Sequence, residues 1–184
     1  RKNDMLLLLL AEHDPKRSII FSNTKAMVDE LTTFLNENGF KADGLHGDMK
    51  QSQRDSVMGA FKGGRTTILV ATDVAARGIH VDGIEVVYNF DLPQEIEYYV
   101  HRIGRTARAG KSGKAYTFCS EQDVYNLPAI ERYIEMSIPS RVAYPEQMLE
   151  DKSSGIYIKT EFGHDDHDDR KKSNRSYDKN RSDN

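Results

Sequence analysis

Three arginines stand at steps of three residues, and their spacing could serve anion chemistry. Arg102, Arg105 and Arg108 fall within YVHRIGRTARAG at 99–110. Side chains three residues apart at a helix end project to one side. Guanidinium groups held that close repel one another unless an anion joins them, and their planar forks match phosphate oxygens. The cluster therefore predicts a polyphosphate or nucleic-acid backbone ligand, with a solvated basic surface as the alternative.

Polar residues and glycines follow the apolar runs that would form strands. Thr72 offers a hydroxyl and backbone N–H groups to a phosphate, and Gly47 lets a backbone approach a ligand closely. Gln51 and Arg54 stand at the start of an expected helix, where free N–H groups favour anions. Each signal is weak alone, but all of them fall at one expected edge of a sheet.

Two parts of an ATPase are absent from the sequence. It has no Gly-x-x-x-x-Gly-Lys-Ser/Thr phosphate loop and no Asp-Glu pair after a strand to hold magnesium. If the chain serves ATP chemistry, it must lend arginines to a nucleotide held by another domain, a contribution worth about 10³–10⁵ in rate. No Ser/His/Asp or Cys/His set indicates a hydrolase, and the six histidines lack metal-ligand spacing.

The composition fits one soluble domain with a tail. The chain has 184 residues, 38% hydrophobic and 30% charged, which excludes collagen-like and wholly disordered proteins. A net charge of −3 gives no global basic field, so nucleic-acid binding must come from local arginines and lysines. The longest apolar run, residues 5–11, is shorter than the roughly 20 residues that span a bilayer. Cys119, the single cysteine, lies in an apolar run and is predicted to be a buried structural thiol in a reducing cytosol.

The elements that must position these residues alternate along the chain. Apolar, β-branched runs predict strands at 18–22, 41–46, 66–71, 84–90 and 115–120. Between them, helical patterns run from an N-cap at Thr24 to Gly39, from a Ser52 capping box to Gly63, and from Pro93 to Arg102. A last helix is expected over 121–136, broken at 128. This alternation predicts an α/β fold, a parallel sheet with helices on both faces and ligands at its carboxyl edge.

The end of the chain has a different composition. Residues 161–184 hold seven acidic and six basic side chains and few apolar ones. Such a segment cannot bury enough surface to offset its ordering entropy. We therefore expect a folded domain over 1–145, followed by a linker and a disordered, charged C-terminal tail over 146–184. The histidines and aspartates of 164–169 are interpreted as a solvated charge run rather than a metal site.

Four segments together resemble a known family. They are IIFSNTK at 19–25, LHGD at 45–48 with Gln51 and Arg54, ILVATDVAARGI at 68–79 and YVHRIGRTARAG at 99–110. Their order and spacing resemble the C-terminal RecA-like helicase domain of a bacterial DEAD-box ATP-dependent RNA helicase, of superfamily 2. The resemblance covers about residues 1–145. It implies a RecA-like parallel β-sheet sandwiched by helices, and ATP-driven local unwinding of RNA duplexes.

The resemblance also implies roles at the nucleotide. Arg105 and Arg108 would be catalytic arginine fingers that reach the γ-phosphate of ATP, which the N-terminal RecA-like domain of the same protein would hold with Mg²⁺. Where the family has Asp after a hydrophobic residue, this sequence has His80, whose imidazole can hydrogen-bond a ribose hydroxyl. The further residues implied at the nucleotide and the interdomain cleft are Arg77, Gly78, His80, His101 and Arg102.

RNA would be the second ligand. The resemblance implies contacts to its sugar–phosphate backbone from Asn23, Thr24, Gly47, Asp48, Gln51, Arg54 and Thr72. It also implies a cytoplasmic protein without a membrane partner, whose partner proteins act in ribosome assembly or RNA decay. Two alternatives stay open from the sequence: a non-catalytic RecA-like module that binds RNA or protein, and a DNA helicase domain of the same superfamily.

Overall fold

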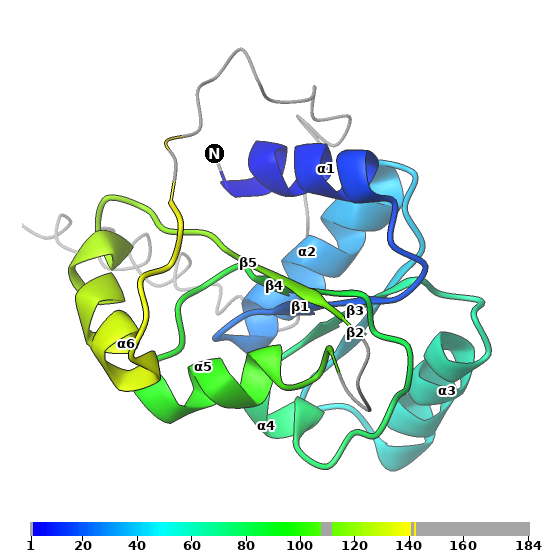
Figure 1. Ribbon diagram of the computed structural model, residues 1–184. Helices are drawn as coiled ribbons and strands as arrows, with labels where there is room; N and C mark the ends of the chain where they lie inside the picture. The colour runs from blue at the N-terminus through cyan, green and yellow to red at the C-terminus, as the bar shows by residue number, and fades with distance from the viewer. Residues whose placement is uncertain (1, 108–111, 141, 143–184) are drawn as a thin grey trace, which may run out of the picture.

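The computed structural model describes residues 2–107, 112–140 and 142, and its fold is the expected α/β type (Figure 1). One sheet of five parallel strands has the order β2-β3-β1-β4-β5. The strands lie within or beside the predicted runs and are shorter at their ends. They are β1 (Ser18–Phe21), β2 (Ala42–Leu45), β3 (Ile68–Ala71), β4 (Val86–Asn89) and β5 (Lys114–Thr117).

Helices cover both faces of the sheet. In Figure 1, α1 and α2 lie on one side and α3, α4 and α5 on the other, with α6 beside α5. The helices are α1 (Lys2–His13), α2 (Lys25–Glu37), α3 (Gln51–Lys62), α4 (Asp73–Ala76), α5 (Ile96–Ile103) and α6 (Leu127–Ile134), with a 3₁₀ turn η1 (Asp123–Tyr125) before α6. The predicted tail over 146–184 lies outside the described residues.

Alternation along the strands divides the core into two layers. Ile20 of β1 packs with Leu6 of α1 in one buried cluster, whereas its neighbours Ile19 and Phe21 pack with Phe61 of α3 in another. Successive side chains of a strand point to opposite faces, so a strand buried on both faces is apolar throughout. Burying each such side chain is worth about 1.5–3 kcal/mol, which fixes the central strands and the loops that leave them.

Two helix boundaries are as predicted and one is not. The Thr24 hydroxyl accepts a hydrogen bond from the backbone N–H of Met27 (3.2 Å), which makes Thr24 the N-cap of α2. Gly39 follows that helix with a φ of 89°, a backbone conformation that suits glycine. The predicted capping box at Ser52 is wrong, because the N-cap of α3 is Lys50, two residues earlier, and the Gln53 side chain accepts from the Lys50 N–H (2.9 Å) instead.

The two prolines act differently from the prediction. Pro93 does not open the helix, because α5 begins at Ile96 and Pro93 lies in the preceding loop. That loop is held in place by its neighbours: the carbonyl of Leu92 accepts from the Asn23 side chain at 2.7 Å. Pro128 does not break a helix but lies in the first turn of α6, where its missing N–H leaves no bond unmade.

The prediction of a buried thiol at Cys119 is also wrong. Strand β5 is an edge strand that ends at Thr117, and Phe118 takes the buried position after it. Because side chains alternate in direction, the next residue turns away, and Cys119 is exposed. Partial desolvation nevertheless raises the pKa of the Cys119 thiol above its ordinary value.

Candidate functional site

The carboxyl ends of the five strands are aligned in register. The register pairs Leu45 with Ala71, Ala71 with Phe21, Phe21 with Asn89, and Asn89 with Thr117. The loops that leave the strands therefore start side by side, in the order of the sheet. This carboxyl edge is where parallel α/β sheets bind ligands, and the predicted site residues lie on or beside its loops.

Arg102 of α5 is the centre of this edge, and its guanidinium is 1% exposed. It donates from Nε and NH2 to the two carboxylate oxygens of Asp73, at 2.7 and 2.8 Å. It also donates to the Asn23 side-chain oxygen (2.8 Å) and to the Asp91 carbonyl (2.6 Å), with its Cζ 5.3 Å from the centre of the Phe21 ring. One side chain thus ties together the loops after β1, β3 and β4.

Arg102 consequently does not project outward, as the predicted arginine cluster required. Helix α5 ends at Ile103, so Arg105 lies beyond the helix rather than one turn along it. A buried guanidinium with a bidentate carboxylate has its charge already compensated. Its burial would fit a positioning role better than contact with a ligand.

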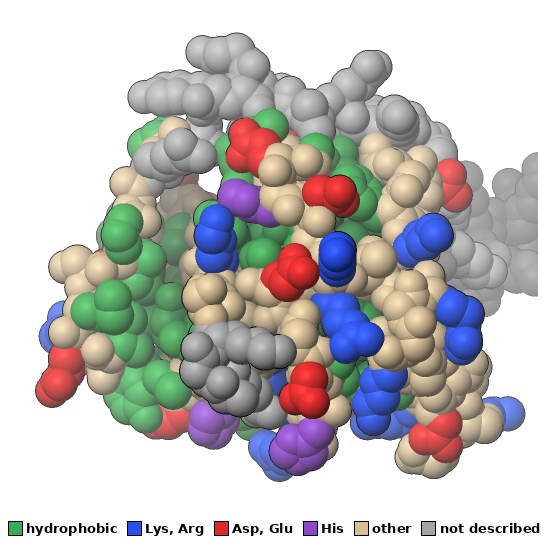
Figure 2. Space-filling view, turned by 45° about the vertical axis from the view of Figure 1, so that its right-hand side comes forward, with side chains coloured by type: hydrophobic (Ala, Val, Ile, Leu, Met, Phe, Trp, Pro, Cys, Tyr) green, Lys and Arg blue, Asp and Glu red, His purple; other side chains and the backbone are tan. Residues whose placement is uncertain are grey.

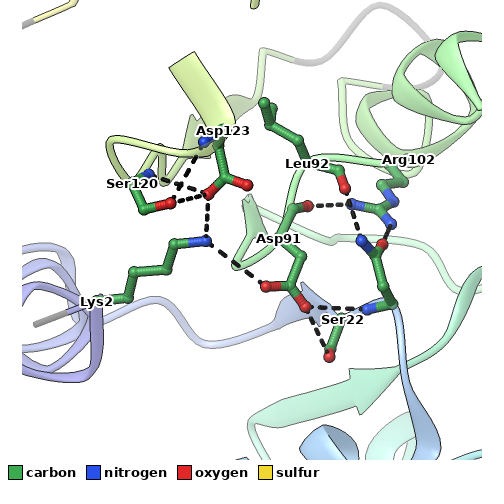
Figure 3. Close-up of polar contacts among 8 residues, drawn as sticks. Lys2, Ser22, Asp91, Leu92, Arg102, Ser120 and Asp123 are labelled. Atoms are coloured by element: carbon green, nitrogen blue, oxygen red, sulfur yellow. Dashed lines mark hydrogen bonds and ion pairs between the residues drawn. The ribbon is translucent and has the colours of Figure 1, made fainter. Parts of the chain in front are cut away.

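Asp91 continues the network toward α1 (Figure 3). Its carboxylate accepts from the Ser22 hydroxyl (3.0 Å) and the Asn23 N–H (3.1 Å), and its other oxygen lies 3.6 Å from the Lys2 ammonium. Lys2 also donates to Asp123 at 2.8 Å. Asp91 was not identified from the sequence, although it follows a strand and the same edge argument applies to it.

Asp123 is stabilised as a carboxylate. Partial burial acts to raise its pKa, but the Lys2 ammonium and the N–H and hydroxyl of Ser120 outweigh it, so the pKa lies below the ordinary value. Lys2 therefore stays between two negative side chains, one after β4 and one in η1. The start of α1 is fastened to the functional edge through this contact.

A pocket opens beside Arg102 on the same edge. Its wall consists of Phe21, Asp73, Ala76, Arg77, Tyr98, His101, Arg102 and Arg105. Arg77 is exposed and donates to the Tyr98 hydroxyl at 3.1 Å. Among the described residues, no carboxylate lies within ion-pair distance of Arg77, so an anion in this pocket would meet an uncompensated charge.

Arg105 reaches across the pocket to the loop after α4. Its NH1 donates to the carbonyl of Ile79 at 2.9 Å, next to the exposed His80. Gly78 begins this turn with a φ of 77°. Arg108, the second predicted finger, lies outside the described residues. The structure thus brings Arg77, His101, Arg102 and Arg105 to one pocket; Tyr98 joins them and was missed, although it stands one helical turn before Arg102.

The second group of predicted residues surrounds the loop after β2. Gly47 and Asp48 are exposed, and the Asp48 carboxylate lies 2.6 Å from the Lys25 ammonium. Arg54 of α3 donates to the His46 carbonyl (3.3 Å) and to the Ala75 carbonyl (3.4 Å). Arg54 thereby joins α3 to the ends of β2 and α4.

Thr72 caps α4 and borders the same loop. Its hydroxyl accepts from the Ala75 N–H at 3.4 Å, and its own N–H donates to the Leu45 carbonyl at 3.4 Å. The backbone that carries Gly47, Arg54 and Thr72 therefore converges at one corner. Lys25 was not assigned to the site from the sequence, and the structure adds it.

Three predicted RNA-contacting residues are engaged elsewhere. Gln51 donates to Asp55 within α3 at 2.8 Å, and the Thr24 hydroxyl is used as the N-cap of α2. Asn23 belongs to the Arg102 network. Each of these three side chains thus has a hydrogen-bond partner within the protein.

The surface charge is mixed. On the face shown in Figure 2, Lys and Arg side chains are interspersed with Asp and Glu rather than forming a separate basic field. Binding of a polyanion would therefore depend on individual cations such as Lys25, Arg54 and Arg77, whose contribution falls with salt. In the part of the chain that the structure describes, no group of three or more His, Cys, Asp or Glu could hold a metal ion. No helix there is both long and apolar enough to cross a bilayer.

Comparisons with known proteins agree with this architecture. Residues 1–110 match the helicase conserved C-terminal domain. The chain is 49% identical over 138 residues to the ATP-dependent RNA helicase RhlB of Xanthomonas axonopodis pv. citri, which is 75% of this chain and 24% of that relative. It therefore spans about a quarter of that relative's length.

Two solved structures share the fold. One is the crystal structure of the E. coli DEAD-box protein SrmB bound to regulator of ribonuclease activity A. Its sequence is 40% identical to this chain, and the two structures align with a TM-score of 0.73 over 80% of this chain and 86% of that one. The structure of S. cerevisiae Dbp5 bound to RNA and ADP BeF3 is 36% identical, with a TM-score of 0.71 over 77% of this chain and 38% of that one.

The parallel α/β fold and the family match together define the class of protein. The chain belongs to the helicase conserved C-terminal domain family, and within it to the RecA-like C-terminal domains of DEAD-box RNA helicases, of bacterial type.

Proposed function

We propose that this chain is the second motor domain of an ATP-dependent DEAD-box RNA helicase, whose N-terminal RecA-like domain holds ATP and Mg²⁺. The observation that carries this proposal is the carboxyl edge itself. There Arg77 and Arg105 line one pocket, while Gly47, Arg54 and Thr72 surround a second corner. Both lie on loops that leave a single row of strand ends.

At the nucleotide, Arg77 and Arg105 are suited to exchange partners. In this structure Arg77 donates to the Tyr98 hydroxyl, and NH1 of Arg105 donates to the Ile79 carbonyl. A phosphate oxygen would add the attraction between opposite charges to hydrogen bonds from the same guanidinium groups. Arg105 acts in the proposal as a finger on the γ-phosphate, with Arg108 as its companion, and His80 lies where a ribose hydroxyl would approach.

At the RNA, the corner formed by Gly47, Arg54 and Thr72 would bind the sugar–phosphate backbone. Lys25 and Arg54 supply positive charge, Gly47 allows close approach, and Thr72 supplies a hydroxyl. Contacts of this kind go to phosphate and sugar, so binding would be independent of base sequence. A preference for RNA over DNA would come from contacts to the 2′-hydroxyl.

Coupling follows from the closed state of two domains. ATP and single-stranded RNA each bridge the domains when they are closed, so each ligand raises the affinity for the other. Buried Arg102 holds the loop of Asp73, beside the nucleotide, against Asn23, which neighbours the RNA corner. Closure places Arg105 at the γ-phosphate, and hydrolysis and phosphate release reopen the domains.

The test uses the full-length protein. We expect Arg105→Ala to lower RNA-stimulated ATP turnover by about 10³-fold or more, because a finger stabilises the transition state. Arg132→Ala, which changes an exposed arginine of α6 far along the chain, is the matched control and should leave turnover unchanged. Normal turnover in Arg105→Ala would refute the finger role.

A second measurement separates the alternatives. RNA and DNA strands of equal length are compared as activators of ATP hydrolysis. Stimulation by RNA alone supports the proposal, equal stimulation by DNA favours a DNA helicase, and none by either favours a non-catalytic module. The isolated chain should hydrolyse no ATP.

The proposal includes the setting of the domain. Residues 1–145 would form the motor domain, and 146–184 a linker and charged tail. We place the protein in the cytoplasm, with partner proteins of ribosome assembly or RNA decay. The SrmB relative was solved with a regulator of ribonuclease activity, which supports partners of the second kind.

A further inference from the structure

His46 lies at the base of the Gly47 turn and is 3% exposed. Its Nδ1 is 3.3 Å from the backbone nitrogen of Asp48, and its Nε2 is 3.1 Å from a carboxylate oxygen of Asp29 on α2. A backbone N–H can only donate, so Nδ1 must accept and carries no hydrogen. The hydrogen of the ring is then on Nε2, which donates to the Asp29 carboxylate.

The contact between Asp29 and His46 has an energetic cost. One of its oxygens accepts from His46, whereas the other, Oδ2, is buried and has no hydrogen-bond partner. A buried oxygen without a partner destabilises a fold by about 1–3 kcal/mol. Packing alone gives no reason for a carboxylate at this position of α2, but fixing the tautomer of His46 does.

The main chain of His46 is held as firmly as its ring. Its carbonyl accepts from Arg54 NH1 at 3.3 Å and from the Met49 N–H at 3.4 Å. The ring and the carbonyl together fix both ends of the short turn through Gly47 and Asp48. With the Asp48 N–H turned inward to the ring, the Asp48 carboxylate meets Lys25 at the surface.

We infer that Asp29 and His46 are positioning residues for RNA binding at the Gly47 turn. Asp29 sets which ring nitrogen bears the hydrogen, Nδ1 then holds the Asp48 amide, and the turn keeps one conformation before RNA arrives. Less conformational entropy is lost on binding to a fixed turn, so affinity rises. This inference rests on the proposed function, in which the turn contacts the RNA backbone.

Two substitutions at position 46 separate positioning from packing. The side-chain oxygen of Asn lies near the place of Nδ1 and can accept from the Asp48 N–H, whereas the amide nitrogen of Gln lies near the place of Nε2 and replaces only the donor to Asp29. We expect His46→Asn in the full-length protein to keep the RNA concentration for half-maximal ATPase stimulation within about threefold of wild type. His46→Gln should raise it about tenfold, with turnover at saturating RNA unchanged.

Asp29→Ala is the second arm, and Glu37→Ala, an exposed acid at the end of the same helix, is its control. Asp29→Ala should also raise the half-maximal RNA concentration, by about three- to tenfold, and Glu37→Ala should leave it unchanged. Equal effects of Asn and Gln at position 46, or a lower melting temperature with no change in the RNA requirement, would overturn the positioning role.

A spectroscopic measurement on the wild-type protein does not depend on variants that fold. With ¹⁵N-labelled histidine, the Nδ1 of His46 should show the shift of an unprotonated nitrogen and the Nε2 that of a protonated one. A proton on Nδ1 would overturn the inference. If wild-type protein bound no RNA, the proposed function would fail, and with it the role of the turn.

Discussion

Removing the guanidinium of Arg102 tests the hydrogen-bond network at the centre of the site. Arg102→Met keeps much of the apolar stem but leaves the Asp73 carboxylate, itself only 15% exposed, without its bidentate partner. It also leaves the Asn23 oxygen and the Asp91 carbonyl without a donor that the structure gives them. Breaking a buried ion pair from one side costs about 3–5 kcal/mol.

The expected change in melting temperature follows from that figure. Unfolding entropy is about 2.1 cal/mol/K per residue, or about 0.3 kcal/mol/K for a domain of roughly 140 residues. A loss of about 3–5 kcal/mol then lowers the melting temperature by about 10–17 °C. Arg102→Lys keeps the charge without the planar fork, so it should cost less.

The assay is thermal and urea unfolding followed by circular dichroism, with Arg132→Met as the control. An exposed arginine on α6 should change stability by no more than about 0.5 kcal/mol. In a double-mutant cycle, Arg102→Met with Asp73→Asn should cost less than the sum of the single changes, by about 1–3 kcal/mol. An Arg102→Met protein as stable as the control would refute the buried network.

Two further predictions concern other parts of the edge. A Cβ at Gly47 would lie 3.8 Å from Lys25, an ordinary contact, so Gly47→Ala should weaken RNA binding at an unchanged melting temperature. A Cβ at Gly44 would lie only 2.8 Å from Thr32, so Gly44→Ala should lower the melting temperature and leave RNA binding unchanged. The folded-state pKa of Asp123 lies below the ordinary value of 3.8, so its contribution to stability is present above about pH 4 and is lost as the pH falls through the lower folded value. The difference in unfolding free energy between wild type and Asp123→Asn should thus be constant near pH 7 and shrink as the pH falls through the lowered pKa of the folded state; a difference that grew on acidification would contradict the sign.

The sheet was predictable because its signal is local. The segments 19–21 and 68–71 within the predicted runs are apolar at every position, and only strands covered on both faces need that composition. The gathering of polar residues at one edge was predictable for a related reason, since residues directly after parallel strands must meet there. Asp91 follows a strand in the same way and could have been found by that rule.

The direction of Arg102 was not predictable from its spacing. Helical steps of three place Arg102 and Arg105 on one side, but the burial of Arg102 depends on Asp73, Asn23 and Asp91, which come from three loops distant in sequence. Only the order of the strands brings those loops together. The start of α5 escaped prediction similarly, because a tertiary hydrogen bond from Asn23 holds the loop around Pro93.

The opposite rim of the sheet offers a practical site for labelling. Gly39 and Gly64 lie in the turns that lead into β2 and β3, and, apart from the adjoining residues, no atom of the described part of the chain lies within 4 Å of the place where a side chain would begin at either position. Both turns are at the amino ends of strands whose carboxyl ends carry the two ligand corners. A fluorophore attached beside one of these glycines would move with the domain as a rigid body. It would report that motion without contacting the loops at the carboxyl edge of the sheet.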